Sequence, residues 1–359
     1  MLGAHDRADN IEPGWRVRSV TLRQCVVPAA ALTDLLAPAD GRPALHWLLR
    51  EVSRFGVSEL APAGRLEGSV RTAVERVAAE LPRPLAVAEP GRRFDERVLW
   101  CGGDAVFDAN LAPLLAAASA DGAGVLARRG VIEGLACVAV ADRRALDAAG
   151  EIRGAPEATA LDGARARMAD PVAREAMLRR LHRPALLLDR DGTINVDQGY
   201  VGTRERFAWI DAARAAIRRA TAAGWHVFLV TNQSGVARGF YEEAAVHALH
   251  AWLAEEVRRD GGTIDDVRYC PHHPDGVVTA YRRASAWRKP APGMILDLIR
   301  AWELDPARCV MVGDQPTDMA AAAAAGIEGH LFTGGNLDAF VAPLLRTRSA
   351  WHGATLAAV

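Results

Sequence analysis

One short stretch limits the possible folds more than any other, and it is residues 183–193, RPALLLDRDGT. Ala185 to Leu188 form an uninterrupted apolar run, and charged and glycine residues follow it directly. A strand that is apolar on both faces is typical of a parallel sheet covered by helices on both sides. The stretch therefore predicts a buried parallel strand with polar groups at its carboxyl end.

Strand and helix patterns keep alternating after this stretch. We expect strands followed by polar loops in 225–235 and 308–318, and helices in 211–224, 241–262, 292–304 and 319–327. Strands that alternate with helices predict a doubly wound parallel sheet. In such sheets ligands bind beyond the carboxyl ends of the strands, which is where the polar residues of this region fall.

The first part of the chain also has an α/β pattern. We expect strands in 23–30, 57–60 and 97–103, helices in 42–57 and 110–122, and a connecting helix in 170–184. Polar, Gly- and Pro-bearing residues precede that connecting helix, as in a linker. The sequence thus predicts a first domain over 1–150, a linker with a connecting helix over 151–182 and a second domain over 183–359.

Composition excludes several classes of function. The chain has 359 residues and a formal net charge of -1, so it has no bulk attraction for nucleic acid or an anionic membrane. Its five cysteines are odd in number and scattered, which favours a reducing compartment. The polar N-terminus lacks a signal-peptide core, and no apolar run reaches bilayer length. We expect a cytoplasmic protein with no nucleic-acid or membrane partner; its oligomeric state stays open.

Four polar sites carry the candidate chemistry: 189–193 (DRDGT), 231–235 (TNQSG), Lys289-Pro290 and 313–318 (GDQPTD). Asp189 and Asp191 are two residues apart on an extended segment and project to the same side, so one can attack while the other moves a proton. Asp314 adds a third carboxylate, and converging oxygen ligands favour Mg²⁺. Thr231 and Lys289 add a hydroxyl and a cation, which completes the groups needed for phosphoryl transfer.

These sites resemble, in residue type and order, the four motifs of the haloacid dehalogenase superfamily of phosphatases, whose fold is a Rossmann-like parallel sheet. The resemblance implies that Asp189 is the nucleophile and Asp191 the general acid/base. It implies that Thr231 and Lys289 bind the phosphoryl oxygens. It also implies that Asp189, Asp314 and the backbone carbonyl of Asp191 bind Mg²⁺.

Residues 184–333 resemble more narrowly the heptose-1,7-bisphosphate 7-phosphatases, a group with a minimal cap. This resemblance implies a small phosphorylated sugar as substrate, with Arg288 binding its distal phosphate and Asn232 orienting it. Histidinol-phosphate phosphatases share much of the pattern, so histidinol phosphate or another small sugar phosphate is the alternative substrate. One departure is Gln315, where the heptose enzymes tend to carry lysine. Lys289 is the only lysine of the chain, so that cation is missing here.

A second departure concerns zinc. The resembled group usually has a loop with Cys-x-His and then Cys-x-Cys before Arg-Lys-Pro. Cys270 and His272 match the first half, but Ser285 and Trp287 stand at the second. A structural zinc site needs four ligands, so we expect Cys270 and His272 to form an incomplete site that holds no structural Zn²⁺.

The first domain resembles sugar nucleotidyltransferases, with Asp104 of GGDAVFD at the place of a metal-binding aspartate. The glycine-rich loop that approaches phosphates in that family is missing, and no lysine precedes Lys289. We interpret residues 1–150 as a degenerate nucleotidyltransferase-like α/β domain without activity. A bifunctional nucleotidyltransferase–phosphatase stays open as an alternative.

Overall fold

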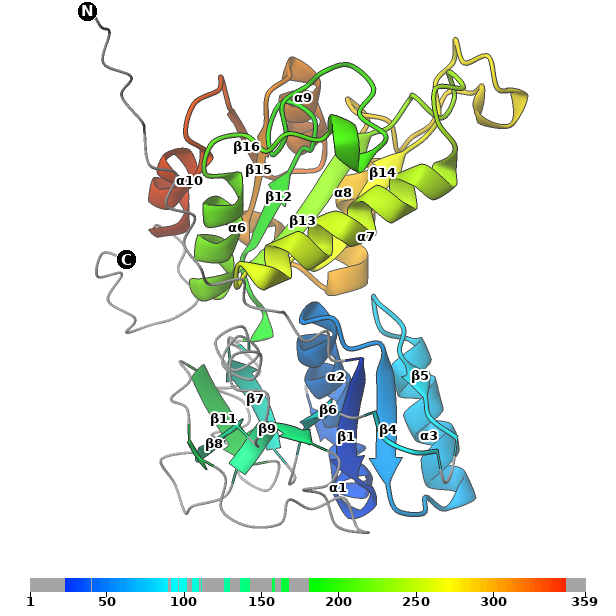
Figure 1. The fold of residues 1–359 in the computed structure, drawn as a ribbon, viewed down its shortest axis with the longest axis vertical. Coiled ribbons are helices and arrows are strands. Elements are labelled where there is room, and N and C mark those ends of the chain that lie inside the picture. Colours follow the sequence, from blue (N-terminus) through cyan, green and yellow to red (C-terminus); the bar gives the residue numbers. More distant parts are fainter. Residues whose placement is uncertain are drawn as a thin grey trace, which may run out of the picture.

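The computed structural model describes residues 23–39, 41–89, 92–95, 97–101, 105–109, 111, 126–129, 136–142, 157–158, 163–167 and 181–346. For the strands between 105 and 167 it describes the backbone only. Two large sheets organise these residues, one in each half of the chain (Figure 1).

The C-terminal sheet has five parallel strands in the order β14-β13-β12-β15-β16. The strands are β12 (Ala185–Leu188), β13 (His226–Asn232), β14 (Asp266–Cys270), β15 (Cys309–Gly313) and β16 (Glu328–Leu331). The chain winds outward from β12 in one direction and then continues at β15 in the other. The edge between β12 and β15 is therefore the topological switch point, where parallel α/β sheets bind their ligands.

Strand β12 is the centre of this half, as its apolar run predicts. Leu186 and Leu188 face one core and Ala185 and Leu187 the other, and all four are buried. Helices α6 (Ala213–Ala222), α7 (Glu243–Arg259) and α10 (Leu337–Arg346) contribute to the first core, and α8 (Gly293–Trp302) and α9 (Pro316–Ala324) to the second. Short 3-10 helices η2 (Arg204–Arg206), η3 (Thr279–Tyr281) and η4 (Pro306–Arg308) lie in the connecting loops. The expected Rossmann-like α/β architecture is confirmed for this half.

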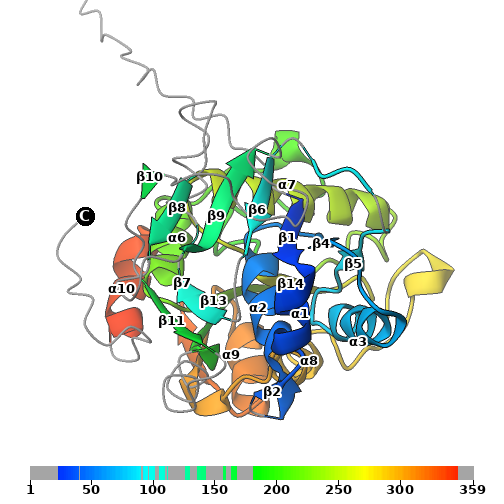
Figure 2. The same ribbon diagram turned by 90° about the horizontal axis from the view of Figure 1, so that it is seen from below.

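The N-terminal sheet has the order β10-β8-β9-β6-β1-β4-β5 (Figure 2). Its strands are β1 (Gln24–Pro28), β4 (Glu59–Ala63), β5 (Ala86–Val87), β6 (Arg97–Trp100), β8 (Leu126–Arg129), β9 (Ala136–Asp142) and β10 (Glu157–Ala158). The pairs β1–β4, β1–β6, β4–β5 and β8–β10 are parallel, whereas β9 runs antiparallel to both β6 and β8. This sheet is therefore mixed, although alternating strands and helices alone predict a parallel one.

The remaining elements among the described N-terminal residues are three helices and two small ladders. They are α1 (Ala29–Leu35), α2 (Ala44–Arg54), α3 (Gly68–Ala79), the pair β2 (Pro38–Ala39) and β3 (Arg42–Pro43), and the pair β7 (Ala105–Ala109) and β11 (Gly163–Arg167). The strand expected in 57–60 begins later, at Glu59, because Val57 and Ser58 connect the turn at Phe55 and Gly56 to it. The expected helices in 110–122 and 170–184, and Asp104, lie largely outside the described residues. The domain boundaries at 150 and 183 stay predictions.

Helix α2 lies between the two halves (Figures 1 and 2). All eleven of its residues are buried, including its charged ones. Its apolar face, with Leu45, Leu48, Leu49 and Val52, packs in the N-terminal core. Its opposite face carries Arg50, Glu51 and Arg54, which contact the C-terminal half.

A buried ionic network joins the halves there. Arg54 donates to Asp265 through Nε at 2.9 Å and to the Trp225 carbonyl through Nη2 at 2.9 Å. Arg183 donates through Nη2 to Glu51 Oε2 at 2.6 Å. Burial opposes the charge on Glu51, but the guanidinium groups of Arg183 and Arg54 outweigh it and lower the pKa of Glu51 to about 2. The carboxylates are thus ionised and paired inside the protein.

These contacts fix the direction in which the halves meet. Arg183, Trp225 and Asp265 each precede a strand of the C-terminal sheet, so the network lies at the amino ends of β12, β13 and β14. In Figure 1 the arrows of β1 and β4 point away from that sheet. The parallel strands β1 and β4 therefore face the C-terminal half with their amino ends, and the carboxyl ends of the two sets of parallel strands point in opposite directions.

Among the residues that the structure describes, no helix combines the length and the hydrophobicity needed to span a bilayer.

The buried network generates a stability prediction. Arg54→Met leaves the carboxylates of Glu51 and Asp265 without this partner inside the protein, so we expect a loss of about 3–5 kcal/mol in the free energy of unfolding. Arg42→Met is the matched control, because Arg42 also pairs across the interface, with Glu303 at 2.7 Å, but is partly exposed. That pair should contribute at most about 1 kcal/mol. Urea unfolding followed by circular dichroism measures both, and equal losses would contradict this account.

A second prediction concerns pH. His226 Nδ1 lies 2.6 Å from Asp265 Oδ2, and burial lowers the pKa of His226 to about 4, below the 6.5 of an exposed imidazole. The unfolded chain binds a proton here between pH 6.5 and 4.5 that the folded chain does not, so stability falls as the pH falls through this range.

His226→Asn keeps an N–H near Asp265 and removes the titration. We expect the slope of unfolding free energy against pH to decrease by up to about 1.4 kcal/mol per pH unit. The exposed His247→Asn is the control. An unchanged slope in the His226 variant would show that this imidazole does not set the acid stability.

Candidate active site

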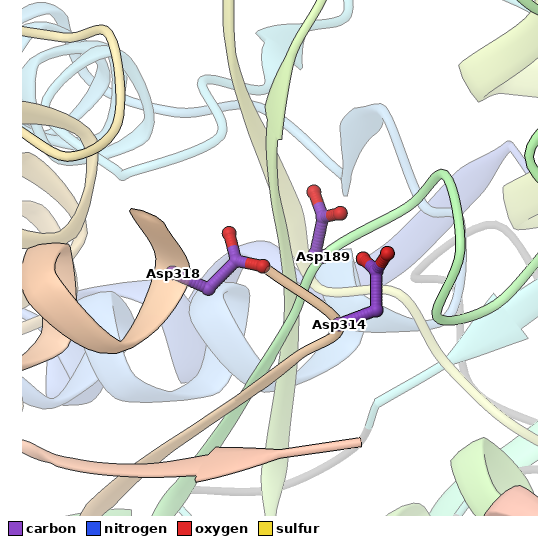
Figure 3. A group of neighbouring side chains, drawn as sticks. All are labelled: Asp189, Asp314 and Asp318. Carbon is purple, nitrogen blue, oxygen red and sulfur yellow. The ribbon is translucent and has the colours of Figure 1, made fainter. Parts of the chain in front are cut away.

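The motif residues meet at the switch point of the C-terminal sheet. Asp189 follows β12 and Asp314 follows β15, and these two strands are hydrogen-bonded neighbours. Figure 3 shows Asp189, Asp314 and Asp318 with their side chains at this edge. One oxygen of each carboxylate lies within 4.8 Å of the others. Parallel pairing of β12 and β15 thus brings together residues more than a hundred positions apart.

Glycine is required at one point of this approach. Gly192 has a φ of +87°, and a Cβ added to it would lie 2.3 Å from Asp314 Oδ2. Any side chain at residue 192 would therefore displace Asp314 or the loop after β12. The Gly of the DRDGT motif lets that loop close over the acidic group.

Lys289 neutralises two of the three acids. Its Nζ lies 2.6 Å from Asp189 Oδ1 and 2.6 Å from Asp318 Oδ1, and it donates to the Val230 carbonyl at 2.8 Å. Burial opposes the charge on Lys289, but the carboxylates of Asp189 and Asp318 outweigh it and raise the pKa of the ammonium group. Burial raises the pKa of Asp189 to about 7, while Lys289 works in the opposite direction.

Asp191 is held apart from this ion pair by its own donors. Arg190 donates through Nε and Nη2 to the carboxylate, at 3.2 and 2.8 Å to Oδ2. Asn195 Nδ2 donates to Oδ1 at 3.0 Å, and Gln233 Nε2 donates to Oδ2 at 2.8 Å. Arg190 itself is fully buried. The side chain of Asp191 is thus oriented by three residues while remaining partly accessible.

Thr231 belongs to the same hydrogen-bonded group. Its hydroxyl accepts from Gln233 Nε2 at 2.8 Å, the amide that also reaches Asp191. Tyr241 in turn donates to Gln233 Oε1 at 2.9 Å, which fixes the amide orientation. Gln233 therefore couples the second motif to the first.

Asn232 contacts Lys289 rather than open space. Its Nδ2 donates to the Lys289 carbonyl at 3.1 Å, and its Oδ1 accepts from the Lys289 backbone N–H at 3.0 Å. The side chain thus positions the third motif against β13. Its predicted contact with substrate stays a prediction.

Arg288 directly precedes Lys289 in the chain. It is half-buried, and its Nη1 is buried without a hydrogen-bond partner. Burial lowers the pKa of Arg288, and the neighbouring Arg238 lowers it further. A buried, unpartnered N–H of a cation is a suitable donor for an anion.

Cys270 and His272 do not point into a common ligand set. The Cys270 thiol is buried and donates to the His272 carbonyl oxygen at 3.9 Å, and His272 Nε2 lies 2.9 Å from Arg283 Nη2. Among the described residues, the only side chains grouped closely enough to hold a metal ion are those of Asp189, Asp314 and Asp318. The expectation that this loop holds no structural zinc stays a prediction.

The acidic group has the donors that a magnesium ion prefers. Asp189, Asp314 and Asp318 all offer carboxylate oxygens. Asp318 also accepts from the Gln315 backbone N–H at 3.0 Å, so it is largely engaged by Lys289 and the start of α9. Burial raises the pKa of Asp314, as expected for an acid that lacks a cation of its own. Asp189 and Asp314 are thus the residues best suited to hold the ion.

The sequence interpretation missed three functional side chains. Asp318 belongs to the motif 313–318, and its place three residues after Gln315, at the start of α9, is the sequence signal for its position near Lys289. Gln233 and Asn195 have no such signal, because a polar amide beside a motif has no distinctive pattern. Only the packing shows that both amides donate to Asp191.

Comparison with known proteins identifies relatives of the C-terminal half. Residues 286–347 match the HAD-hydrolase-like family model. The D-glycero-beta-D-manno-heptose-1,7-bisphosphate 7-phosphatase of Rhodopseudomonas palustris is 53% identical over 163 residues, which are 45% of this chain and 91% of that protein. The phosphatase of the same name from Escherichia coli K12 is 44% identical over 144 residues, 40% of this chain and 75% of that protein.

A crystal structure of D,D-heptose 1.7-bisphosphate phosphatase from B. bronchiseptica, complexed with magnesium and phosphate, is 37% identical. It covers 44% of this chain and 86% of that chain, with a TM-score of 0.39. The relationships cover less than half of this chain and leave its N-terminal half unidentified. On sequence identity over nearly the whole R. palustris protein, the chain belongs to the haloacid dehalogenase-like hydrolases, as a phosphatase homologous to heptose-1,7-bisphosphate 7-phosphatase.

Proposed function

We propose that the chain hydrolyses a phosphomonoester through an aspartyl-phosphate on Asp189, with Asp191 as general acid and base. One observation carries the proposal: the buried Asp189 carboxylate is paired with Lys289 and lies beside Asp314 at the switch point of the sheet. An anionic nucleophile can approach a phosphate dianion only where cations offset the repulsion.

The first half of the reaction transfers the phosphoryl group. A carboxylate oxygen of Asp189 attacks phosphorus, and the bond from phosphorus to the sugar oxygen breaks. Asp191 in its protonated form gives its proton to that leaving oxygen. Thr231 and Lys289 bind the non-bridging phosphoryl oxygens, so the charge that develops on them meets a hydroxyl and an ammonium group.

The second half regenerates the enzyme. Asp191, now a carboxylate, takes a proton from water as the water oxygen attacks the phosphorus. The bond from phosphorus to Asp189 breaks, which releases inorganic phosphate and restores the carboxylate. Asp189, Asp314 and the Asp191 carbonyl would hold a magnesium ion, which would supply positive charge to the phosphoryl oxygens.

The proposed substrate is D-glycero-D-manno-heptose 1,7-bisphosphate, with loss of the 7-phosphate, as the names of the relatives indicate. The half-buried Arg288 supports this choice, because its free Nη1 can bind a phosphate away from the reacting one. Histidinol phosphate is the alternative substrate, and it brings a cationic amino group rather than a second phosphate. The cytoplasmic location and the lack of activity in the N-terminal half also stay proposals.

Asp189→Asn tests the chemistry. The substitution keeps the shape of the side chain but removes the nucleophilic carboxylate, so we expect phosphate release to fall by at least about 10³-fold. Circular dichroism should show an intact fold. Asp34→Asn, exposed on α1, is the control and should leave the rate unchanged. A folded Asp189→Asn protein with normal turnover would exclude this nucleophile.

Substrate comparison tests the specificity. We expect kcat/KM for heptose 1,7-bisphosphate to exceed that for histidinol phosphate by at least about 10-fold, the effect of one charge-assisted hydrogen bond. Steady-state assays of released phosphate measure both values. A higher kcat/KM for histidinol phosphate would show that the alternative substrate is the correct one.

A further inference from the structure

Two arginines without a counter-charge lie together beside the candidate active site. Arg238 comes from the loop after β13, and Arg288 directly precedes Lys289. His273 and Tyr200 are next to them. We call these four residues the two-arginine cluster. Neither arginine forms an ion pair with any residue that the structure describes.

The contacts of Arg238 leave part of its guanidinium unused. Nη2 lies 3.3 Å from His273 Nε2, and the guanidinium carbon lies 5.9 Å from the centre of the Tyr200 ring. Nε is buried and has no hydrogen-bond partner. The rings of His273 and Tyr200 thus orient Arg238, while its Nε–H group stays unpaired.

Arg288 is in the same situation, with Nη1 buried and unpartnered. Burial lowers the pKa of Arg288 most. The charge of the neighbouring Arg238 lowers it as well, so the two cations act on each other. The charge of His273 does not add to theirs at neutral pH, since burial and the two arginines lower the pKa of this imidazole as well. The acid next to His273 is Asp275, 3.8 Å from Nδ1 and strongly exposed.

Such an arrangement is unfavourable without an anion. Buried N–H groups of a cation cost free energy when nothing accepts a hydrogen bond from them. Two neighbouring cations that are partly buried also repel each other. An anion with several acceptor oxygens removes both costs at once. Guanidinium groups bind phosphate oxygens well because their N–H groups form a planar fork.

The two-arginine cluster is linked to the proposed reacting groups through neighbouring residues. Arg288 is covalently adjacent to Lys289, which pairs with Asp189. On the Arg238 side, Tyr200 is close enough to Tyr241 to influence its pKa, and Tyr241 donates to Gln233, which reaches Asp191 and Thr231. An anion bound by the two-arginine cluster therefore lies next to the carboxylates of the proposed reaction and leaves the place of the reacting phosphate free.

The residue after Asp314 does not supply this cation. Gln315 is neutral, and its Nε2 donates to Asp314 Oδ2 at 2.6 Å. Lys289 pairs with Asp189 and Asp318 beside the reacting phosphoryl group, so among the described residues Arg238 and Arg288 are the cations that we assign to a second phosphate.

We propose that Arg238 is a specificity-determining residue that binds, together with Arg288, the second phosphate of a sugar bisphosphate. The inference rests on the proposed function of the site and adds a residue from the loop after β13 to it. Arg238 thereby discriminates bisphosphates from monophosphates and takes no part in bond breaking.

Arg238→Met tests this role with two substrates, heptose 1,7-bisphosphate and heptose 7-phosphate, which lacks the anomeric phosphate. We expect kcat/KM for the bisphosphate to fall roughly 10- to 100-fold, mainly through KM, the size of one or two lost charge-assisted hydrogen bonds. The kcat/KM for the monophosphate should change less than about two-fold, because that substrate has no phosphate to bind to the two-arginine cluster. Arg238→Lys should recover part of the loss.

Arg282→Met is the matched control, an exposed arginine of the same loop region whose loss should affect neither substrate. Equal losses on both substrates in Arg238→Met would show a structural role and overturn the proposal. Unchanged kinetics on the bisphosphate would overturn it as well.

Binding to the Asp189→Asn background separates this proposal from the proposed function, since it requires no turnover. Calorimetry should show tighter binding of the bisphosphate than of the monophosphate, and Arg238→Met should remove most of that difference. A wild-type protein that releases no phosphate from either sugar would refute the proposed function only. Failure of the bisphosphate to bind more tightly, or a difference unaffected by Arg238→Met, would refute the role of Arg238.

Discussion

The ammonium group of Lys289 is the interaction on which the candidate active site depends. It pairs with Asp189 at the end of β12 and with Asp318 on α9, and it donates to the Val230 carbonyl of β13. One compact charge thus ties three separate elements to one point. A planar guanidinium could not reach three acceptors around a single atom in the same space. Without this cation the clustered carboxylates would repel one another inside the protein.

A second set of buried charges works at the other end of the sheet. The network of Arg54, Glu51, Arg183 and Asp265 lies at the amino ends of β12–β14, whereas the acids of the candidate active site lie at the carboxyl ends. The matched segment makes up 91% of the R. palustris phosphatase, so that protein has little room for a counterpart of the N-terminal half. In this chain α2 covers the end of the sheet opposite to the reacting groups, so its contacts with the phosphatase half lie away from the candidate active site.

Cations are distributed unevenly around the site. Lys289 is paired with the acids Asp189 and Asp318, and Gln315 offers only an amide. The unpaired N–H groups of Arg238 and Arg288 stand outside this group, and no residue in the described part of the chain forms an ion pair with either arginine. The separation of one cation that is paired with the acids from two that lack such a partner gives a physical basis for handling two phosphates of one substrate differently.

The sequence by itself determined the parallel α/β architecture of the C-terminal half, since an apolar run such as Ala185–Leu188 can only be buried on both faces. It also predicted Asp189, Asp191, Thr231, Lys289 and Asp314 as site residues, because their motifs have fixed residue types and order, and the structure brings these residues to one edge of the sheet. It missed the antiparallel β9, the contacts of Asp318 and Gln233, and the buried charged residues through which α2 contacts the C-terminal half. These features depend on which side chains face each other across distant segments, and local periodicity carries no information about such pairs; only the tertiary structure decided them.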